Sequence, residues 1–428
     1  MTNQPTHLYT KKVLKNGLTL LMVPIETAAS VTMTVFIKAG SRYESEDQNG
    51  ISHFLEHLHF KGSRKYPNAK KLSETVDSIG GEFNAYTGKE HTQYFIRAAY
   101  EHLDLVFEVL TDMIQNPLID EKELEREKGV IIEEINMYRD NPQIHVESIF
   151  EESLWPDTPL GRDIAGTAEV VRKISKQDVM NYRKKYYQPG NMIIAVAGQF
   201  DQKKFETMID EHWGKLPSTH IFNYKPVNGR QNKPRVKVQT KATEQAHLIV
   251  GFKGYPFRHR NNNALRILAT TLGGGMSSRL FLRVRERMGL AYYISASLNN
   301  YLDSGNFTIQ AGLKVDSVTP AIDVILQELY KVRDQGITVG ELKKAKEYIK
   351  GKIALALEDP HDKLEWYLGQ EAFIGRIRTI KQTFEEFDAV TLDQVKKVAE
   401  DIIKEDCVNL ALIGPFKDSK IFEKKLGI

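Results

Sequence analysis

The sequence predicts an α+β protein made of two tandem, homologous α/β-sandwich domains. The chain has 428 residues, and a single hydrophobic core rarely serves so long a chain. An internal repeat supports the division, because residues 175–179 and the strand ending at Gly198 recur as residues 391–395 and the strand ending at Gly414, each shifted by 216 (391 − 175 and 414 − 198). A stretch rich in Asn, Pro, Gly and Lys, residues 223–234, is predicted to link a domain of residues 1–222 to one of residues 235–428.

The first domain is expected to begin with strands. Residues 13–23 predict a β-hairpin with a type I′ turn at Asn16-Gly17. Residues 31–37 alternate apolar and polar side chains, which predicts a strand with one buried face. Helices are predicted over residues 51–60 and 68–79, and residues 83–98 are expected to be extended.

Two longer helices follow in the first domain. Apolar residues recur at helical spacing over residues 103–114, and the next helix is predicted to start with Asp120 as its N-cap. At about 100° per residue, Glu127 and Glu134 of that helix fall on or beside its apolar face, whereas Glu133 points to solvent. Carboxylates on a buried face are costly unless something positive meets them, and a metal ion would serve.

The helix predicted over residues 51–60 carries the candidate chemistry. His53 and His57 are four residues apart, so both imidazoles project from one face of the helix. That spacing lets two neutral imidazole nitrogens reach one Zn²⁺ at about 2.0–2.1 Å. Glu56 lies close enough to the same face to take a proton from a water at the metal. The order is H-x-x-E-H, the reverse of the commoner H-E-x-x-H.

This motif alone also fits histidines that are satisfied in a core or on a surface, so a third ligand is needed, and Glu134 is the one we predict. The second half of the chain lacks the constellation. With a shift of 218, the helical pattern at residues 339–353 puts Ala345 at the position of Glu127 (345 − 127) and Lys352 at the position of Glu134 (352 − 134). Because the second copy keeps the skeleton and loses these residues together, the pattern favours a chemical role over a packing role.

These residues resemble the pitrilysin family of inverted-motif zinc peptidases, which includes insulin-degrading enzyme and the mitochondrial processing peptidase. The resemblance covers nearly the whole chain. It is carried by the H-x-x-E-H motif with a Glu 77 positions further on (134 − 57), by residues 84–87 and 90–92, and by residues 285–292 in the second half. It implies a half-size member with two similar α+β domains, which forms half of a clam-shell peptidase around a peptide chamber.

The resemblance also implies roles for individual residues of the first half. His53, His57 and Glu134 would bind zinc, one ion per chain, and Glu56 would act as the general base. Glu127 matches an acid that orients or tunes a metal ligand.

Further roles concern the substrate. Asn84 and Ala85 match an edge strand that pairs with the substrate backbone. Arg285 and Tyr292 match a pair that contacts the substrate near the scissile carbonyl, and in a two-chain shell this pair should come from the partner chain. One departure is visible, since position 59 is His where the family usually carries an apolar residue. His59 points about 200° around the helix from His57 and is expected to be a hydrogen-bonded histidine and not a ligand.

Composition excludes several classes of protein. Hydrophobic content of 41%, charged content of 27% and a formal charge of +3 describe an ordinary globular protein with no case for nucleic acid or an anionic membrane. One cysteine excludes internal disulfides and Cys-based zinc sites. Residues 1–6 contain no apolar signal core and no run suits a membrane span, so a cytoplasmic location is expected.

The glycine-rich residues 273–278 lack the Gly-Lys-Ser/Thr ending of a phosphate loop, so they predict a tight turn and not a nucleotide site.

The sequence therefore predicts a zinc metalloendopeptidase that cuts peptides or unfolded segments. A homodimer is expected, or a heterodimer with a related chain. The alternative is a non-catalytic or partner-dependent subunit of a heterodimeric processing peptidase. The intact motif and the presence of both Arg285 and Tyr292 favour a self-sufficient chain.

Overall fold

The structure is a computed structural model in which residues 8–217, 223–227 and 230–428 are described. They form two compact units, each assembled from separate stretches of the chain. Unit 1 runs to Asn136 and adds Arg162–Lys225 and Ala356–Ile377; unit 2 combines Met137–Gly161, Pro226–Leu355 and Arg378–Ile428. Parts of the predicted domain boundary and linker (residues 218–222, 228 and 229) and the N-terminal stretch used to predict the location lie outside the described residues.

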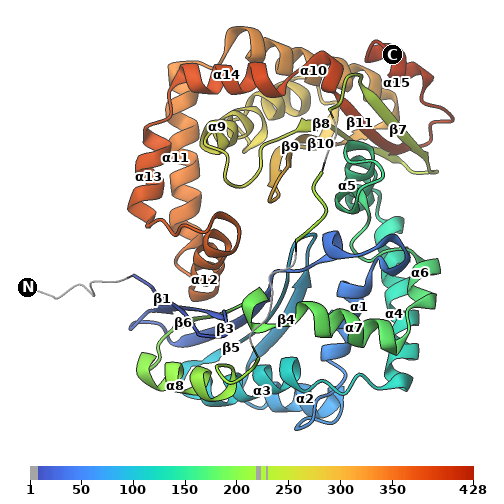
Figure 1. Ribbon diagram of the computed structural model, residues 1–428. Coiled ribbons are helices and arrows are strands. Elements are labelled where there is room, and N and C mark those ends of the chain that lie inside the picture. Colours follow the sequence, from blue (N-terminus) through green and yellow to red (C-terminus); the bar gives the residue numbers. More distant parts are fainter. Residues whose placement is uncertain (1–7, 218–222, 228–229) are drawn as a thin grey trace, which may run out of the picture. The chain divides into compact units, whose positions relative to one another are not determined.

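Unit 1 is built on a six-stranded sheet in the order β1-β2-β6-β3-β5-β4 (Figure 1). Its strands are β1 (Thr10–Val13), β2 (Thr19–Pro24), β3 (Ser30–Ile37), β4 (Glu82–Thr87), β5 (Thr92–Ala99) and β6 (Met192–Gly198). Its first helices are α1 (Ile51–His59), α2 (Ala69–Asp77), α3 (Leu103–Gln115) and α4 (Glu121–Asp140), and the last turn of α4 lies in unit 2. Later along the chain, unit 1 adds α6 (Ala168–Lys173), α7 (Lys176–Tyr186) and α8 (Gln202–His212).

Unit 2 is built on a five-stranded sheet in the order β7-β11-β8-β10-β9. Its strands are β7 (Arg235–Thr240), β8 (Gln245–Lys253), β9 (Ala291–Asn300), β10 (Gly305–Lys314) and β11 (Asn409–Gly414). Its helices are α9 (Asn262–Gly273), α10 (Val318–Gln335), α11 (Val339–Ala356), α13 (Ile380–Asp388), α14 (Leu392–Ile402) and α15 (Lys420–Lys425). Residues 281–287 after α9 form a π-helical turn.

The two sheets have the same topology apart from β1. Each contains one parallel pair, β2 with β6 and β7 with β11, and the next neighbours, β3 and β8, run antiparallel to these. Both sheets then continue with two antiparallel strands and end at β4 or β9. The repeat predicted from the sequence is therefore a repeat of the fold.

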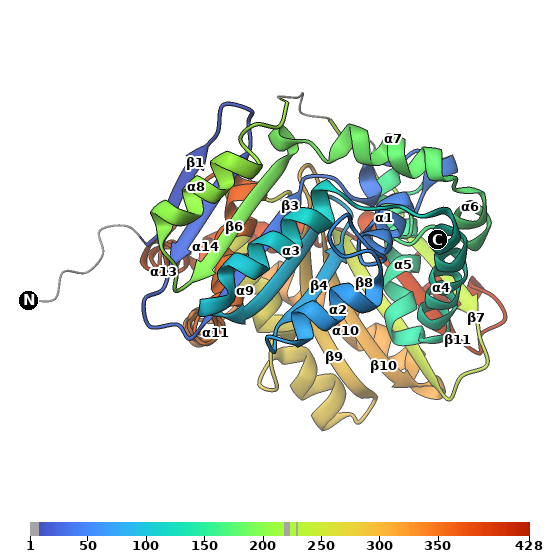
Figure 2. The same ribbon diagram turned by 90° about the horizontal axis from the view of Figure 1, so that it is seen from below.

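Each sheet is covered on one face by helices of its own half of the sequence. In unit 1, α3 and α8 lie across that face, which Figure 2 shows from the helix side. The opposite face is covered by α12 (Pro360–Gly369), which comes from the second half of the chain and packs on β6 and β3 (Figure 1). Side chains of α12 bury the apolar residues that this face presents, namely Leu21, Val23, Phe36, Ile193, Ala195 and Ala197.

Unit 2 shows the reciprocal arrangement. The helix on the second face of its sheet is α5 (Pro142–Leu154), which comes from the first half of the chain and packs on β11, β8 and β7. Phe150 and Trp155 are buried there against strand residues such as Ile249 and Ile413. The two halves of the sequence have thus exchanged one helix each.

One detail of the predicted hairpin is wrong. Strands β1 and β2 pair as expected, but only Gly17 of the predicted Asn16-Gly17 pair has positive φ, at 84°. A type I′ turn needs positive φ at both central residues. The loop is instead closed by Leu14 N to Leu18 O (2.8 Å) and Gly17 N to Leu14 O (2.9 Å), and the Asn16 side chain donates to Trp213 O at 2.8 Å. Asn16 therefore ties the hairpin to the chain after α8.

Among the described residues, no helix is both long enough and apolar enough to cross a bilayer.

Candidate metal centre

Helix α1 is fixed at its start by a close backbone contact. Gly50 precedes the helix with φ 101°, and a Cβ there would lie 2.4 Å from the carbonyl oxygen of Ala165, so only glycine fits. The first backbone N–H groups of a helix lack intrahelical acceptors. Here the buried carboxylate of Glu44 accepts from Gly50 N at 2.7 Å and from Ser52 N at 2.8 Å, and it also accepts from the Ser52 hydroxyl.

The two motif histidines project together from α1. Ile51, Phe54, Leu55 and Leu58 are buried in the core of unit 1 and fix the rotation of the helix. The remaining face presents His53 and His57, whose ring centroids are 4.6 Å apart at an interplanar angle of 71°. The periodicity of the motif is realised as predicted.

Glu134 reaches this face from α4. Its Oε2 lies 3.6 Å from His53 Nε2 and 3.3 Å from His57 Nε2. One ligand atom from each of the three residues lies within 4.8 Å of the other two. Ligand atoms at about 2.0–2.1 Å around tetrahedral zinc are about 3.3–3.4 Å apart. The donor set of two imidazoles and one carboxylate, and the two measured separations, fit a zinc ion.

The electrostatics of the two histidines differ. Burial and the neighbouring His57 lower the pKa of His53 to about 4, so its imidazole is neutral near pH 7, the form that binds metal. Burial alone would also lower the pKa of His57, but its hydrogen bonds with Glu127 and Glu134 raise that pKa to about 9. A metal ion must therefore displace a proton from His57 on binding.

Glu127 contacts the ring nitrogen of His57 that does not face Glu134. Its Oε2 lies 3.1 Å from His57 Nδ1 and its Oε1 lies 2.8 Å from Lys61 Nζ. Burial alone would raise the pKa of Glu127, but the bonds from His57 and Lys61 lower it, so the carboxylate stays ionised. With Nδ1 engaged, His57 presents Nε2 to Glu134. The side chain of Glu127 is almost fully buried and that of Glu133 is exposed, as the helical periodicity predicted.

Glu56 is half-buried beside the cluster. Its Oε2 accepts a hydrogen bond from the hydroxyl of Thr87, the last residue of β4. Burial raises the pKa of Glu56, while the Thr87 hydrogen bond acts in the opposite direction. A carboxylate whose pKa is moved toward neutrality is suited to accept a proton and to give it back.

His59 is fully buried on the opposite side of α1 and belongs to a tyrosine network. Its Nδ1 lies 2.8 Å from the carbonyl oxygen of Leu55 and 3.0 Å from Tyr94 Oη, and Tyr94 Oη lies 2.8 Å from Tyr187 Oη. The expectation of a hydrogen-bonded histidine that does not take part in the cluster is confirmed.

The predicted substrate residues are placed as follows. Asn84 and Ala85 lie in β4, which is the edge strand of the unit 1 sheet and adjoins α1. Arg285 and Tyr292 belong to unit 2, and both are exposed. The Arg285 guanidinium lies 4.7 Å from the ring centroid of Phe281. Their roles toward a substrate stay predictions.

Three residues that support the site had no signal of their own in the sequence. Glu44 holds the start of α1, Thr87 orients Glu56, and Lys61 neutralises Glu127. Thr87 lies in the stretch 84–87 already singled out, and Lys61 follows the motif directly, but their partners become visible only in the folded chain.

The fold and the site together define a two-unit α/β protein with a His-His-Glu centre of the kind that holds zinc. Residues 20–168 match the family model described as insulinase (peptidase family M16), and residues 173–349 match that described as the peptidase M16 inactive domain. The chain belongs to peptidase family M16.

Individual relatives and solved structures agree with this family assignment. The chain is 36% identical, over 94% of its length and 97% of the relative's, to an uncharacterized zinc protease of Bacillus subtilis. Its fold is similar to that of a protease from Helicobacter pylori, with a TM-score of 0.89 at 24% identity over 95% of this chain and 99% of that one. It is also similar to a peptidase M16 inactive domain from Pseudomonas fluorescens, with a TM-score of 0.88 at 17% identity over 95% and 98%. The family and the relatives support a peptidase and point to zinc.

Proposed function

We propose that this chain is a zinc-dependent endopeptidase that hydrolyses peptides or unfolded polypeptide segments. The observation that carries the proposal is the convergence of His53, His57 and Glu134 at distances that suit one zinc ion, with the carboxylate of Glu56 beside them. An ion held there supplies Lewis acidity, which polarises a carbonyl and lowers the pKa of water.

The residues of the chain have separate tasks in this proposal. Glu56 accepts the proton of the attacking water and passes it to the leaving amine, and the raised pKa of Glu56 suits both transfers. Thr87 keeps one oxygen of Glu56 engaged, so the other is free to face the water. Glu127 fixes the ring of His57 through Nδ1.

The edge strand β4 is proposed to receive the substrate. Residues 82–86 alternate between exposed and half-buried, with Asn84 and Tyr86 exposed, and Thr87 is buried. An extended peptide that added to this edge would run toward Thr87 and hence toward Glu56.

Arg285 and Tyr292 are proposed to stabilise the oxyanion from a partner chain in a closed two-chain chamber, and such a donor typically lowers the barrier by a few kcal/mol. A cytoplasmic homodimer is the form in which we expect this enzyme to act.

The second candidate is a partner-dependent or non-catalytic subunit of a heterodimeric peptidase. The observation in its favour is the match of residues 173–349 to a domain described as inactive. That match concerns the half of the chain without the cluster, so we place this candidate second.

One experiment separates the two candidates. The purified chain is loaded with zinc and incubated with a peptide mixture, with and without a chelator, and the cut sites are read by mass spectrometry while the mass in solution is measured. We expect cleavage that the chelator abolishes. Cleavage only after a different chain is added would support the second candidate.

A set of variants tests the roles. Glu56→Gln should keep zinc and lose about 10²–10⁴-fold in turnover, the usual range for a general base. Glu134→Gln should lose zinc, whereas Glu133→Gln, which alters the exposed neighbour on the same helix, should behave like the parent protein. Near-parental cleavage by Glu56→Gln would rule out the base assignment.

A further inference from the structure

Unit 2 contains a pocket at the position that corresponds to the metal cluster of unit 1. The first part of the correspondence is between α1 and α9. The buried residues of α1 are Ile51, Ser52, Phe54, Leu55, Leu58 and His59, and a shift of 213 places each of them on a buried residue of α9: Ala264, Leu265, Ile267, Leu268, Thr271 and Leu272. The same shift places Arg266 at the position of His53 (266 − 53 = 213) and Thr270 at that of His57 (270 − 57 = 213).

The second part concerns α4 and α11. With the shift of 218, the buried residues Glu127 and Ile131 of α4 correspond to the buried residues Ala345 and Ile349 of α11. Lys352 then stands where Glu134 stands in unit 1 (352 − 134 = 218).

The third part concerns the edge strands. Ala85 of β4 pairs with Tyr94, and Ala296 of β9 pairs with Ile309. Tyr94 and Ile309 are themselves equivalent, because Tyr94 pairs with Val35 of β3 and Ile309 pairs with Val250 of β8, both with a shift of 215 (309 − 94 and 250 − 35). The strand segment 296–298 therefore takes the place of residues 85–87.

These three elements line an open pocket of about 350 Å³. Arg266 and Thr270 line it from α9, Ser297 from β9, and Tyr348 and Lys352 from α11. The rest of the lining is apolar, and none of the lining residues carries a carboxylate. Where unit 1 gathers acids and imidazoles, unit 2 gathers two cations and three hydroxyl groups.

The two cations carry no internal counter-charge. Within the described part of the chain, neither Arg266 nor Lys352 has an ion pair with a carboxylate, and the Lys352 ammonium lies 5.8 Å from the centroid of the Tyr348 ring. Lys352 is exposed, whereas burial and the positive charge of Arg378 lower the pKa of Arg266. Because Arg266 is desolvated beside a second cation, Arg378, and Lys352 lines the same pocket, an anion in the pocket would lower the electrostatic energy of these groups.

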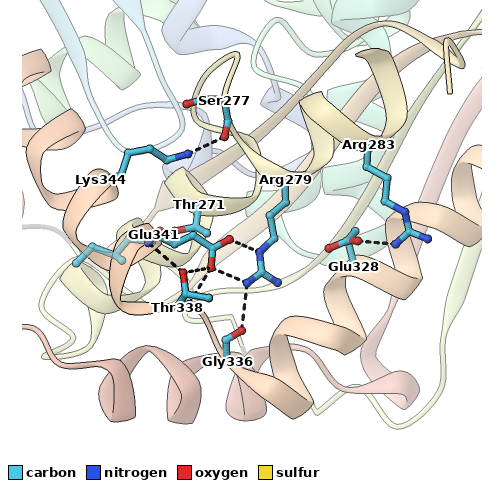
Figure 3. Close-up of polar contacts among 10 residues, drawn as sticks. Thr271, Ser277, Arg279, Arg283, Glu328, Gly336, Thr338, Glu341 and Lys344 are labelled. Atoms are coloured by element: carbon cyan, nitrogen blue, oxygen red, sulfur yellow. Dashed lines mark hydrogen bonds and ion pairs between the residues drawn. The ribbon is translucent and has the colours of Figure 1, made fainter. Parts of the chain in front are cut away.

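Basic residues near the pocket differ from Arg266 and Lys352, because each of them has a hydrogen-bonded partner (Figure 3). Arg279 donates to both oxygens of Glu341 at 2.6 and 2.7 Å, and Lys344 of α11 donates to Ser277 O at 2.7 Å. These contacts tie the loop after α9 to α11. A Cβ on Gly275 of that loop would lie 3.2 Å from the Tyr348 ring, so the ring that lines the pocket is packed against the loop. The Tyr348 side of the pocket is thus held in place by packing.

We propose that this pocket, the Arg266–Lys352 pocket, binds a carboxylate group of a peptide. A guanidinium fork and an ammonium are the usual partners of carboxylates, and the apolar part of the lining suits the side chain or methylene groups that accompany the anion. The open edge of β9 lies directly beside the pocket, so an extended peptide on that edge can place its carboxylate between the two cations. This binding goes beyond the proposed hydrolysis, since it requires neither the metal cluster nor turnover.

The test uses the full-length Glu56→Gln protein without metal, so that failure of hydrolysis has no bearing on it. Binding of an N-acetylated tripeptide, Ala-Ala-Leu, is measured by calorimetry with a free C-terminal carboxylate and with a C-terminal amide; a third peptide has the amide and an internal Glu. We expect binding of at least one carboxylate peptide, weakened at higher salt. The first or the third peptide then identifies a C-terminal or a side-chain carboxylate as the source.

Variants connect the binding to the pocket. Arg266→Gln and Lys352→Gln should each weaken carboxylate binding at least tenfold, whereas Lys343→Gln, an exposed lysine of α11 outside the pocket, should leave it unchanged. Thermal unfolding confirms that the variants are folded. The proposal is overturned if no carboxylate peptide binds, if the amide without Glu binds equally well, or if the folded double variant keeps parental affinity.

Discussion

Glu127 Oε2 lies 3.1 Å from Nδ1 of His57, and the other oxygen of the same carboxylate lies 2.8 Å from Nζ of Lys61. The carboxylate therefore links a metal-facing imidazole to a cation on the next turn. Glu127→Gln should weaken zinc binding about 10–100-fold, because outer partners of this kind orient the ring and raise its basicity. Competition against a chromophoric chelator measures the change. Glu125→Gln, at an exposed position of the same helix, is the control; parental zinc affinity in folded Glu127→Gln would contradict the role.

Thr87 donates a hydrogen bond to Glu56 from the end of β4. Thr87→Val keeps the shape of the side chain and removes that donor. Since a hydrogen bond to a charged group is worth about 1.5–3 kcal/mol, kcat should fall about 10–100-fold with zinc affinity unchanged. Steady-state kinetics and zinc titration together check this. Thr75→Val, at a half-buried position of α2 where the hydroxyl donates to Lys71 O, serves as the matched substitution, and an equal loss in both variants would show that the Thr87 hydrogen bond is not responsible.

Glu365 of α12 is expected to make the stability of unit 1 depend on pH. Gln93 Nε2 donates to Glu365 Oε2 at 3.2 Å, and burial raises the pKa of Glu365 to about 6. A carboxyl group whose folded pKa is raised binds more protons folded than unfolded, so its contribution to stability falls as pH rises from about 4.3 to 6. Glu365→Gln should therefore raise the melting temperature at pH 8 and leave it unchanged at pH 4. A rise of equal size at both pH values would mean that titration of Glu365 is not the cause.

Leu364 of α12 is fully buried against the second face of the unit 1 sheet. Leu364→Ala should cost about 2–5 kcal/mol, the range for deleting a buried Leu side chain. Urea unfolding measures the loss. Leu355→Ala, nine residues earlier and 67% exposed, should cost little. Equal, small effects of the two substitutions would show that α12 does not carry the stability of that face.

Much of the site could be predicted because it depends on periodicity. The turn spacing of α1 puts His53 and His57 on one face, and the same reasoning placed Glu127 inside and Glu133 outside on α4. That Glu134 lies close to the two histidines could be seen only in the folded chain. The joint absence of all three residues from the second half of the sequence nevertheless suggested that they share one role.

Other features could not be read from the sequence for physical reasons. Glu44 and Thr87 act through side-chain hydrogen bonds to residues on other elements, and no local pattern records such a partner. The hairpin turn was predicted with the wrong geometry because Asn16 takes part in a bond to Trp213, 197 residues away. No local pattern records which sheet α5 or α12 covers, because each packs on strands from the other half of the sequence.

That exchange of α5 and α12 has a consequence for biosynthesis. The last contiguous stretch of unit 1 before the exchange ends at Lys225, and the segment that contains α12 starts at Ala356, so 130 residues (355 − 225) are translated between them. At a translation rate of about 5–20 residues per second, the apolar face of the unit 1 sheet stays uncovered for roughly 7–26 s until the segment with α12 is made. During that interval the nascent chain offers chaperones a surface that the finished protein hides. For the same reason, splitting the gene between the two halves would leave each product with a bare sheet.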